Sequence, residues 1–109
     1  MVEYTLQLDS IFGSLSDPTR RDILRRVAKN EMSVSEIAKP YNLSFAAVSK
    51  HLKVLEKALL IVKHKNGKKH MIQLAPQALA SASEYLEWYG QFMDVRYDAL
   101  ESYINKGGK

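Results

Sequence analysis

The sequence predicts a mainly α-helical domain that carries one small β-hairpin. Apolar residues recur at three- and four-residue intervals in five separate segments, which is the spacing of amphipathic helices. Only residues 61–74 combine short apolar runs with a central Asn66-Gly67 pair, which is typical of a hairpin. The 109 residues suit a single domain, whose modest core makes association with a partner plausible from size alone.

Two short helices are expected in the N-terminal part. Residues 6–15 show helical apolar spacing, and this first helix must stop before Pro18. Asp17 is expected to cap the second helix, because Pro18 suits the first helical position and the residue before a proline is pushed out of the helical region. This second helix should bury Ile23, Leu24 and Val27 and carry Arg20, Arg21, Arg25 and Arg26 around them.

The next two predicted helices form a helix-turn-helix over about residues 34–58. Ser33 and Glu36 make a capping box, S-x-x-E, that opens a short helix, and Pro40 limits this helix because proline breaks helical hydrogen bonding. In the turn that follows, Leu43 is expected to point inward, and Ser44 is expected to cap the fourth helix. Two short helices around a brief turn are the pattern of this motif.

The fourth helix is predicted to have one apolar and one cationic face. Val48, Leu52, Leu55 and Leu59 recur at intervals of four, three and four residues, so we expect them to be buried together. The opposite face is small and positively charged, and such a face fits the major groove of DNA. An ordinary solvated face is the alternative. The candidate DNA-contacting residues are Ser44, Phe45, Ala46, Ser49, Lys50, His51 and Lys53.

A positively charged hairpin is predicted over residues 61–74. Asn66 and Gly67 suit the two central positions of a type I′ turn, which both need positive φ. Residues 44–75 hold seven lysines and one glutamate, so the positive excess of the chain lies in this segment. Lysines on a hairpin can simply aid solubility, and only their nearness to the fourth helix favours phosphate binding. The candidate phosphate contacts are Lys63, Lys65, Lys68 and Lys69.

One long helix is predicted from residue 76 to about residue 105. Its apolar residues trace a near-heptad stripe, which packing on the first helix of the same chain would cover only in part. We therefore expect a two-fold interface to bury the rest. The candidate interface residues are Leu6, Phe12, Leu86, Tyr89, Met93, Leu100 and Ile104, and the stripe is widened by Tyr85, Trp88, Phe92 and Tyr103.

Two motifs in this order resemble the ArsR/SmtB family of winged helix-turn-helix repressors, over nearly the whole chain. Residues 15–24 read L-S-D-P-T-R-R-D-I-L, and residues 48–55 read V-S-K-H-L-K-V-L, close to the family's V-S-x-H-L-x-x-L. The resemblance implies five helices and a two-stranded wing, formed by the hairpin. It also implies a homodimer through the first and last helices, which occupies a pseudo-palindromic operator on double-stranded DNA and represses transcription.

The chain departs from the metal-sensing members of that family. Ser33 and Ser35 stand where the arsenic sensors have two cysteines, and serine supplies no thiolate. The zinc sensors place Asp and His ligands on the last helix, whereas this chain has no histidine after His70. We therefore expect no metal and no other cofactor. Leu59 replaces the usual glycine after the fourth helix, so we expect this helix to end differently or run on.

Composition argues against several classes of function. The chain has no cysteine, which excludes a disulfide framework and a thiol switch. Its longest aliphatic run, residues 58–62, is too short to span a bilayer, so a cytoplasmic protein without a membrane partner is expected. No phosphate-binding loop or catalytic histidine–carboxylate spacing occurs, so an enzyme is not expected. A winged-helix module for protein contacts is the alternative, and a small-molecule effector stays an open question.

Overall fold

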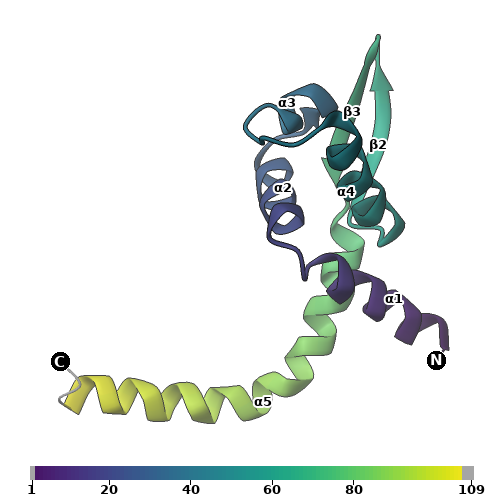
Figure 1. Ribbon diagram of the computed structural model, residues 1–109. Helices are drawn as coiled ribbons and strands as arrows, with labels where there is room; N and C mark the ends of the chain where they lie inside the picture. The colour runs from purple at the N-terminus through teal and green to yellow at the C-terminus, as the bar shows by residue number, and fades with distance from the viewer. Residues whose placement is uncertain (1, 107–109) are drawn as a thin grey trace.

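Five helices and a small antiparallel sheet form the computed structural model, which describes residues 2–106, with side chains for residues 7–92 and 101–105. The five helices and the hairpin are those predicted, and one further short strand joins the hairpin (Figure 1). In chain order the elements are α1 (Val2–Ser14), α2 (Pro18–Lys29), β1 (Met32–Ser33), α3 (Val34–Ala38), α4 (Phe45–Lys57), β2 (Ile61–Asn66), β3 (Lys69–Leu74) and α5 (Pro76–Lys106).

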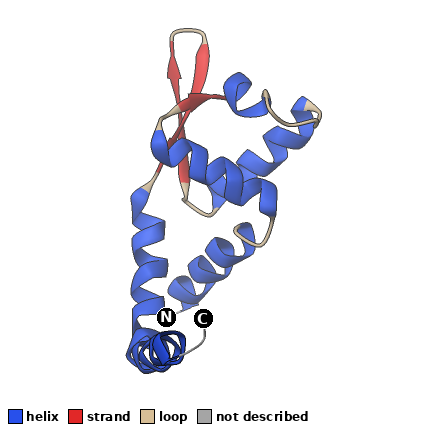
Figure 2. Ribbon diagram, turned by 90° about the vertical axis from the view of Figure 1, so that its left-hand side faces the viewer, coloured by secondary structure: helices blue, strands red, loops and turns tan. Residues whose placement is uncertain are grey.

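Helices α2, α3 and α4 pack on the sheet around one apolar core (Figure 2). The predicted stripes of α2 and α4 supply much of this core, and the sheet closes it. Burying these side chains is the main favourable term that orients α4 against the sheet. The core residues are Ile11, Ile23, Leu24, Val27, Ile37, Val48, Leu52, Leu55, Ala58, Leu60, Ile61, Ile72, Ala78 and Ala82.

The three predicted N-caps are confirmed. The side chains of Asp17, Ser33 and Ser44 each accept a hydrogen bond from the backbone N–H three residues further on. Ser33 and Glu36 form the complete capping box, with the Ser33 N–H donating to Glu36 Oε1 at 2.9 Å. Because each cap satisfies an otherwise unpaired donor, these residues fix where α2, α3 and α4 begin.

Arginines of α2 hold the ends of the neighbouring helices, a role that the sequence did not reveal. Arg20 Nε donates to the carbonyl of Ser14 at 2.6 Å, at the end of α1. Arg26 donates to the carbonyls of Ile37 and Glu36 at 2.9 and 3.0 Å, in α3. The last carbonyls of a helix lack partners within it, so these contacts satisfy them and tie α1, α2 and α3 together.

The sheet has the strand order β1-β3-β2, all antiparallel. The short strand β1 was not predicted, because two residues show no alternation and Ser33 reads as a helix cap. The hairpin is confirmed, but its predicted turn is wrong by one residue. Asn66 pairs with Lys69, so Gly67 and Lys68 are central, and positive φ occurs at Gly67 alone (67°). That is the pattern of a type II′ turn, with glycine first.

Two leucines do not lie where the sequence predicted. Leu43 does not point inward, since 43% of it is exposed. Leu59 leaves the buried stripe of α4, is 58% exposed and has φ of 62°. The expectation that α4 avoids a left-handed end is therefore wrong. The N–H of Leu60 donates to the carbonyl of Leu55 at 3.0 Å across this turn, the bond of a Schellman motif, and both residues are fully buried.

Helix α5 starts at the base of the hairpin, passes beside α1 and then extends away from the rest of the structure (Figure 1). Among the described side chains of α5, Ala78 and Ala82 belong to the core and Leu79 packs against it. Further along, the rings of Tyr85 and Phe12 of α1 lie 5.9 Å apart. None of the helices in the described part of the chain is both long and apolar enough to cross a membrane.

Candidate nucleic-acid interface

The outer side of α4 forms an open basic surface. Ala46, Lys50 and Lys53 are exposed and, with Ser49, border a shallow depression of about 520 Å³. Ser44 and Phe45 are exposed at the start of the same helix. The small side chains between the lysines leave room for another molecule to approach the helix closely, as major-groove binding requires.

Helix α4 and the hairpin face each other across a groove of about 340 Å³. Phe45, Ser49, Lys53 and the acidic Glu56 line it from the helix, and Lys63 and His70 line it from the hairpin. The predicted nearness of the two cationic elements is therefore present, although His70 was not among the predicted contacts. His70 could have been recognised as a candidate contact from its position opposite Lys65 in the paired strands of the hairpin.

The four lysines of the hairpin do not share one face. Lys63 pairs with Ile72 and Lys65 pairs with His70, so both lysines lie on the face whose base enters the core. Lys69 follows the turn on the opposite face, and Lys68 lies in the turn itself. Residues 62–70 are all exposed, and the hairpin projects beyond the helices (Figure 2). Such a projection can reach backbone phosphates on either side.

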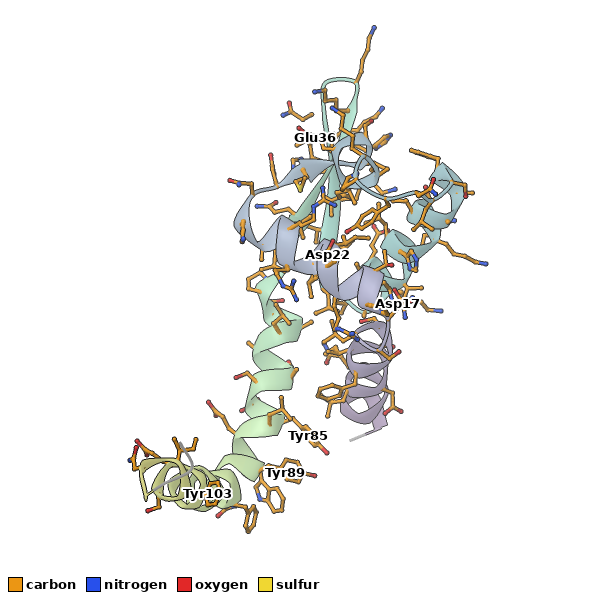
Figure 3. The ribbon with its side chains drawn as sticks, turned by 60° about the vertical axis from the view of Figure 1, so that its left-hand side comes forward. Asp17, Asp22, Glu36, Tyr85, Tyr89 and Tyr103 are labelled. Atoms are coloured by element: carbon orange, nitrogen blue, oxygen red, sulfur yellow. The ribbon has the colours of Figure 1, made fainter. Side chains whose placement is uncertain are left out.

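His51 contacts α2, although it also borders a small depression together with Lys50 of its own helix. Its side chain is 21% exposed, and Nδ1 lies 3.8 Å from Asp17 Oδ2 and 3.4 Å from Arg20 Nη1. Asp17 lies at the start of α2 (Figure 3). The hydrogen bond from the backbone N–H of Arg20 lowers the pKa of the Asp17 carboxyl. The charges of His51 and of the Arg20 side chain lower this pKa further. His51 thus connects α4 to α2.

Contacts of Tyr41 with α2 hold the turn between α3 and α4. The Tyr41 hydroxyl donates a hydrogen bond to the Asp22 carboxylate, and the Arg26 guanidinium lies 5.4 Å from the centre of the Tyr41 ring. Burial raises the pKa of the Tyr41 phenol, and the bond to Asp22 raises it further. No local sequence signal marks this contact, because Asp22 and Tyr41 are 19 residues apart.

The four predicted interface residues with described side chains are all exposed apolar residues of α1 and α5. In the isolated chain Phe12, Leu86, Tyr89 and Ile104 are 38, 53, 41 and 56% exposed. The other predicted interface residues, Leu6, Met93 and Leu100, lie outside the described side chains. Tyr85 and Tyr89 lie on α5 near its bend, and Tyr85 points toward α1 (Figure 3). Ring contacts continue through Trp88 and Phe92.

The region holds no evident cation site. Within the described residues, no three His, Cys, Asp or Glu side chains gather as metal ligands. Ser33, at the position of a family cysteine, uses its hydroxyl to cap α3. The interface therefore offers lysine ammonium groups, hydroxyl groups and apolar surface, which suit phosphates and base edges.

Comparisons with known proteins agree with this geometry. A helix-turn-helix domain family model matches residues 15–64. The HTH-type transcriptional regulator Rv2034 of Mycobacterium tuberculosis is 36% identical over 98 residues, covering 83% of this chain and 92% of that protein. The arsenical resistance operon repressor of Staphylococcus xylosus is 32% identical over 89 residues, covering 82% and 79%.

A solved structure shows the same fold over most of the chain. The ArsR family transcriptional regulator RHA00566 superposes with a TM-score of 0.76 at 30% identity, covering 83% of this chain and 93% of that one. These relatives are transcriptional regulators, which places the chain outside the enzymes. The chain belongs to the ArsR family of DNA-binding, winged helix-turn-helix transcriptional regulators.

Proposed function

We propose that this chain is a cytoplasmic repressor that binds a pseudo-palindromic operator as a homodimer. The groove between α4 and the hairpin carries this proposal, because Lys53, Lys63 and His70 converge there beside the exposed start of α4. Lysines on the helix and on the hairpin beside it can engage phosphates while the helix enters the major groove.

The two elements have different proposed tasks. The first half of α4 reads bases through Ser44, Phe45, Ala46, Ser49, Lys50 and Lys53. The hairpin binds phosphates through Lys63, Lys65, Lys68 and Lys69, because flexible ammonium groups on a projecting hairpin suit a backbone better than a base edge. The connection of His51 to Asp17 and Arg20 supports a positioning role for His51.

The proposed dimer uses the apolar face of α1 and α5. Rings from Phe12, Tyr85, Trp88, Tyr89 and Phe92 form a connected row that stays partly in water in one chain. A large contiguous apolar patch commonly marks a protein interface. A homodimer with two-fold symmetry would also fix the distance between its two α4 helices, which must match half-sites about 34 to 36 Å apart.

The proposed repressor does not respond to arsenite or zinc through the family's cysteine site. The similar S. xylosus protein is named for arsenical resistance, whereas this chain has no cysteine. Thiolates are what select soft metals. We expect operator affinity to stay the same when either ion is added at micromolar concentration, measured by fluorescence anisotropy. A stoichiometric effect would contradict this part of the proposal.

Selection of bound duplexes from a random pool tests the main proposal. The selected sequences should share an inverted repeat, with half-site centres about 10 base pairs apart or a multiple of this spacing. The selected duplex should bind at least about 10³-fold more tightly than random duplex. Recovery of no shared sequence would instead support the alternative, a module for protein contacts.

Single substitutions in α4 then test its assigned role. Lys50→Ala should weaken binding to the selected duplex and relax the preference at particular base pairs by about 1 to 3 kcal/mol. Ser49→Ala should act at a different base pair, or show by a general loss of stability that Ser49 only supports its helix. An unchanged preference in both variants would show that neither Ser49 nor Lys50 reads a base.

A further inference from the structure

Phe45 is a large apolar side chain left exposed on a basic surface. It occupies the first position of α4, is 65% exposed and is not part of the core. The helix start is fixed, because Ser44 Oγ accepts the N–H of Ala47 at 3.1 Å. The ring therefore leaves apolar area in water, which a molecule bound in the adjoining groove between α4 and the hairpin could cover.

The surroundings of Phe45 indicate which molecule this is. Phe45 lines the groove between α4 and the hairpin, together with Lys53, Lys63 and His70. In helix-turn-helix proteins the first residues of the second helix of the motif contact base edges. A duplex held by the two lysines would therefore meet Phe45 within its major groove.

The side chains available on α4 restrict what the helix can read. Its sequence, F-A-A-V-S-K-H-L-K-V-L-E-K, contains no Arg, Asn or Gln. Lysine can pair with the two acceptors of guanine, but the bidentate contact to adenine needs Asn or Gln. Without Asn or Gln, the helix can still recognise an A·T pair by one further feature in the major groove, the C5-methyl group of thymine. This methyl is the apolar group in the major groove, and a phenyl ring suits it.

We propose that Phe45 is a specificity-determining residue that contacts the C5-methyl group of a thymine at a fixed position in each half-site. This inference rests on the proposed operator binding and adds to it a chemical requirement on the operator. Ala46, the exposed next residue, lets the ring approach the bases without obstruction.

Replacing thymine by deoxyuridine tests the contact directly, because the exchange removes the methyl group and keeps every hydrogen-bonding group of the base. We would replace each thymine of the selected duplex in turn and measure the dissociation constants of the wild type and of Phe45→Ala by fluorescence anisotropy. At one position in each half-site, deoxyuridine should weaken wild-type binding about fourfold, the equivalent of one buried methyl group. The Phe45→Ala variant should bind both duplexes equally.

Two further variants test whether the sensitivity to the methyl group depends on an apolar side chain at position 45. Phe45→Leu keeps an apolar side chain and should keep part of the sensitivity to the methyl group. Leu43→Ala removes another exposed apolar side chain, which precedes the cap of α4, and should keep all of it. If Phe45→Ala binds too weakly at physiological salt, lower salt strengthens binding to every duplex and leaves the ratio of the two affinities as the readout.

Three results would overturn the inference: a selected operator without a fixed A·T pair, wild-type binding indifferent to every deoxyuridine, or a Phe45→Ala variant as sensitive as the wild type. Each of these requires a protein that selects a sequence. A wild type that selects none would refute the proposed function itself, so the two failures are distinguishable.

Discussion

Leu59 holds a backbone conformation that ordinarily belongs to glycine. Its φ of 62° is in the left-handed region. Because its side chain is 58% exposed, burial of that side chain offsets little of the free-energy cost of this conformation. That conformation costs a residue with a Cβ atom about 1 to 2 kcal/mol. The fold tolerates this cost because the turn brings Leu60 into the core and pairs its N–H with the Leu55 carbonyl.

Leu59→Gly should therefore stabilise the protein. The relief of the left-handed conformation is partly offset by the greater freedom of glycine in the unfolded chain, which leaves a gain of about 0.5 to 1 kcal/mol. Urea unfolding at one fixed protein concentration measures it. Leu59→Ala is the matched control, because alanine removes the exposed side chain but keeps Cβ. Equal stability of the Gly and Ala variants would show that φ is not the cause.

Glu36 should make stability depend on pH in the acidic range. The Ser33 N–H, and then its hydroxyl, lower the pKa of the Glu36 carboxyl. A group whose folded pKa lies below its unfolded pKa stabilises the fold above the unfolded value and loses this effect as the pH falls through the folded value. Glu36→Gln keeps a capping box without a titrating group.

The test compares the free energy of unfolding of the wild type and Glu36→Gln from pH 7 to about pH 3, a range that includes the ordinary glutamate pKa. The wild type should lose more stability over this range than the variant does. Parallel curves would show that the carboxylate charge contributes nothing at this cap.

At the scale of elements, the hairpin places its lysines on two faces and at its tip. Lys63 and Lys65 lie on the side of α4, whereas Lys68 and Lys69 lie at and beyond the turn. If the hairpin binds phosphates, the tip pair contributes binding energy that does not depend on base sequence. The face toward α4 instead borders the groove proposed to read bases.

Lys68→Ala combined with Lys69→Ala should weaken binding to all duplexes alike and flatten its salt dependence. Each lost phosphate contact lowers the slope of log K against log salt by about 0.9, because fewer counterions are released. Titrations at several salt concentrations measure this slope. Arg25→Ala with Lys29→Ala removes the same charge from exposed positions on α2 and is the control. A changed base preference with an unchanged slope would contradict phosphate binding by the tip.

Sequence reasoning succeeded for elements whose signal is local. The caps at Asp17, Ser33 and Ser44, and the buried stripe of α4 as far as Leu55, follow from neighbouring residues alone. It failed where tertiary contacts decide. The direction of Leu43 and the pairing of β1 depend on partners far along the chain. The DNA-contacting residues stay a prediction, and the contact of His51 with Asp17 could not be predicted because it depends on the packing of α2 on α4.

At the scale of the whole molecule, the basic and apolar surfaces lie on different elements. The hairpin and α4 carry the lysines, and α5 carries its exposed aromatic residues beyond the point where it leaves the core (Figures 1 and 3). DNA binding and self-association can therefore occur at once. A two-fold pair through α1 and α5 would hold both basic surfaces at a fixed separation, which operator recognition requires.

Leu86→Asp should convert the dimer to a monomer and abolish tight operator binding. Leu86 is 53% exposed in one chain, so a carboxylate there is tolerated in the monomer but would be buried unpaired in the dimer, which is strongly disfavoured. Ser83→Asp adds the same charge at an exposed position beside Glu84 and Glu87, and should remain dimeric. Analytical ultracentrifugation gives the oligomeric state, and anisotropy gives the affinity. A dimeric Leu86→Asp variant would place the interface elsewhere, whereas a monomer with full operator affinity would show that pairing does not organise recognition.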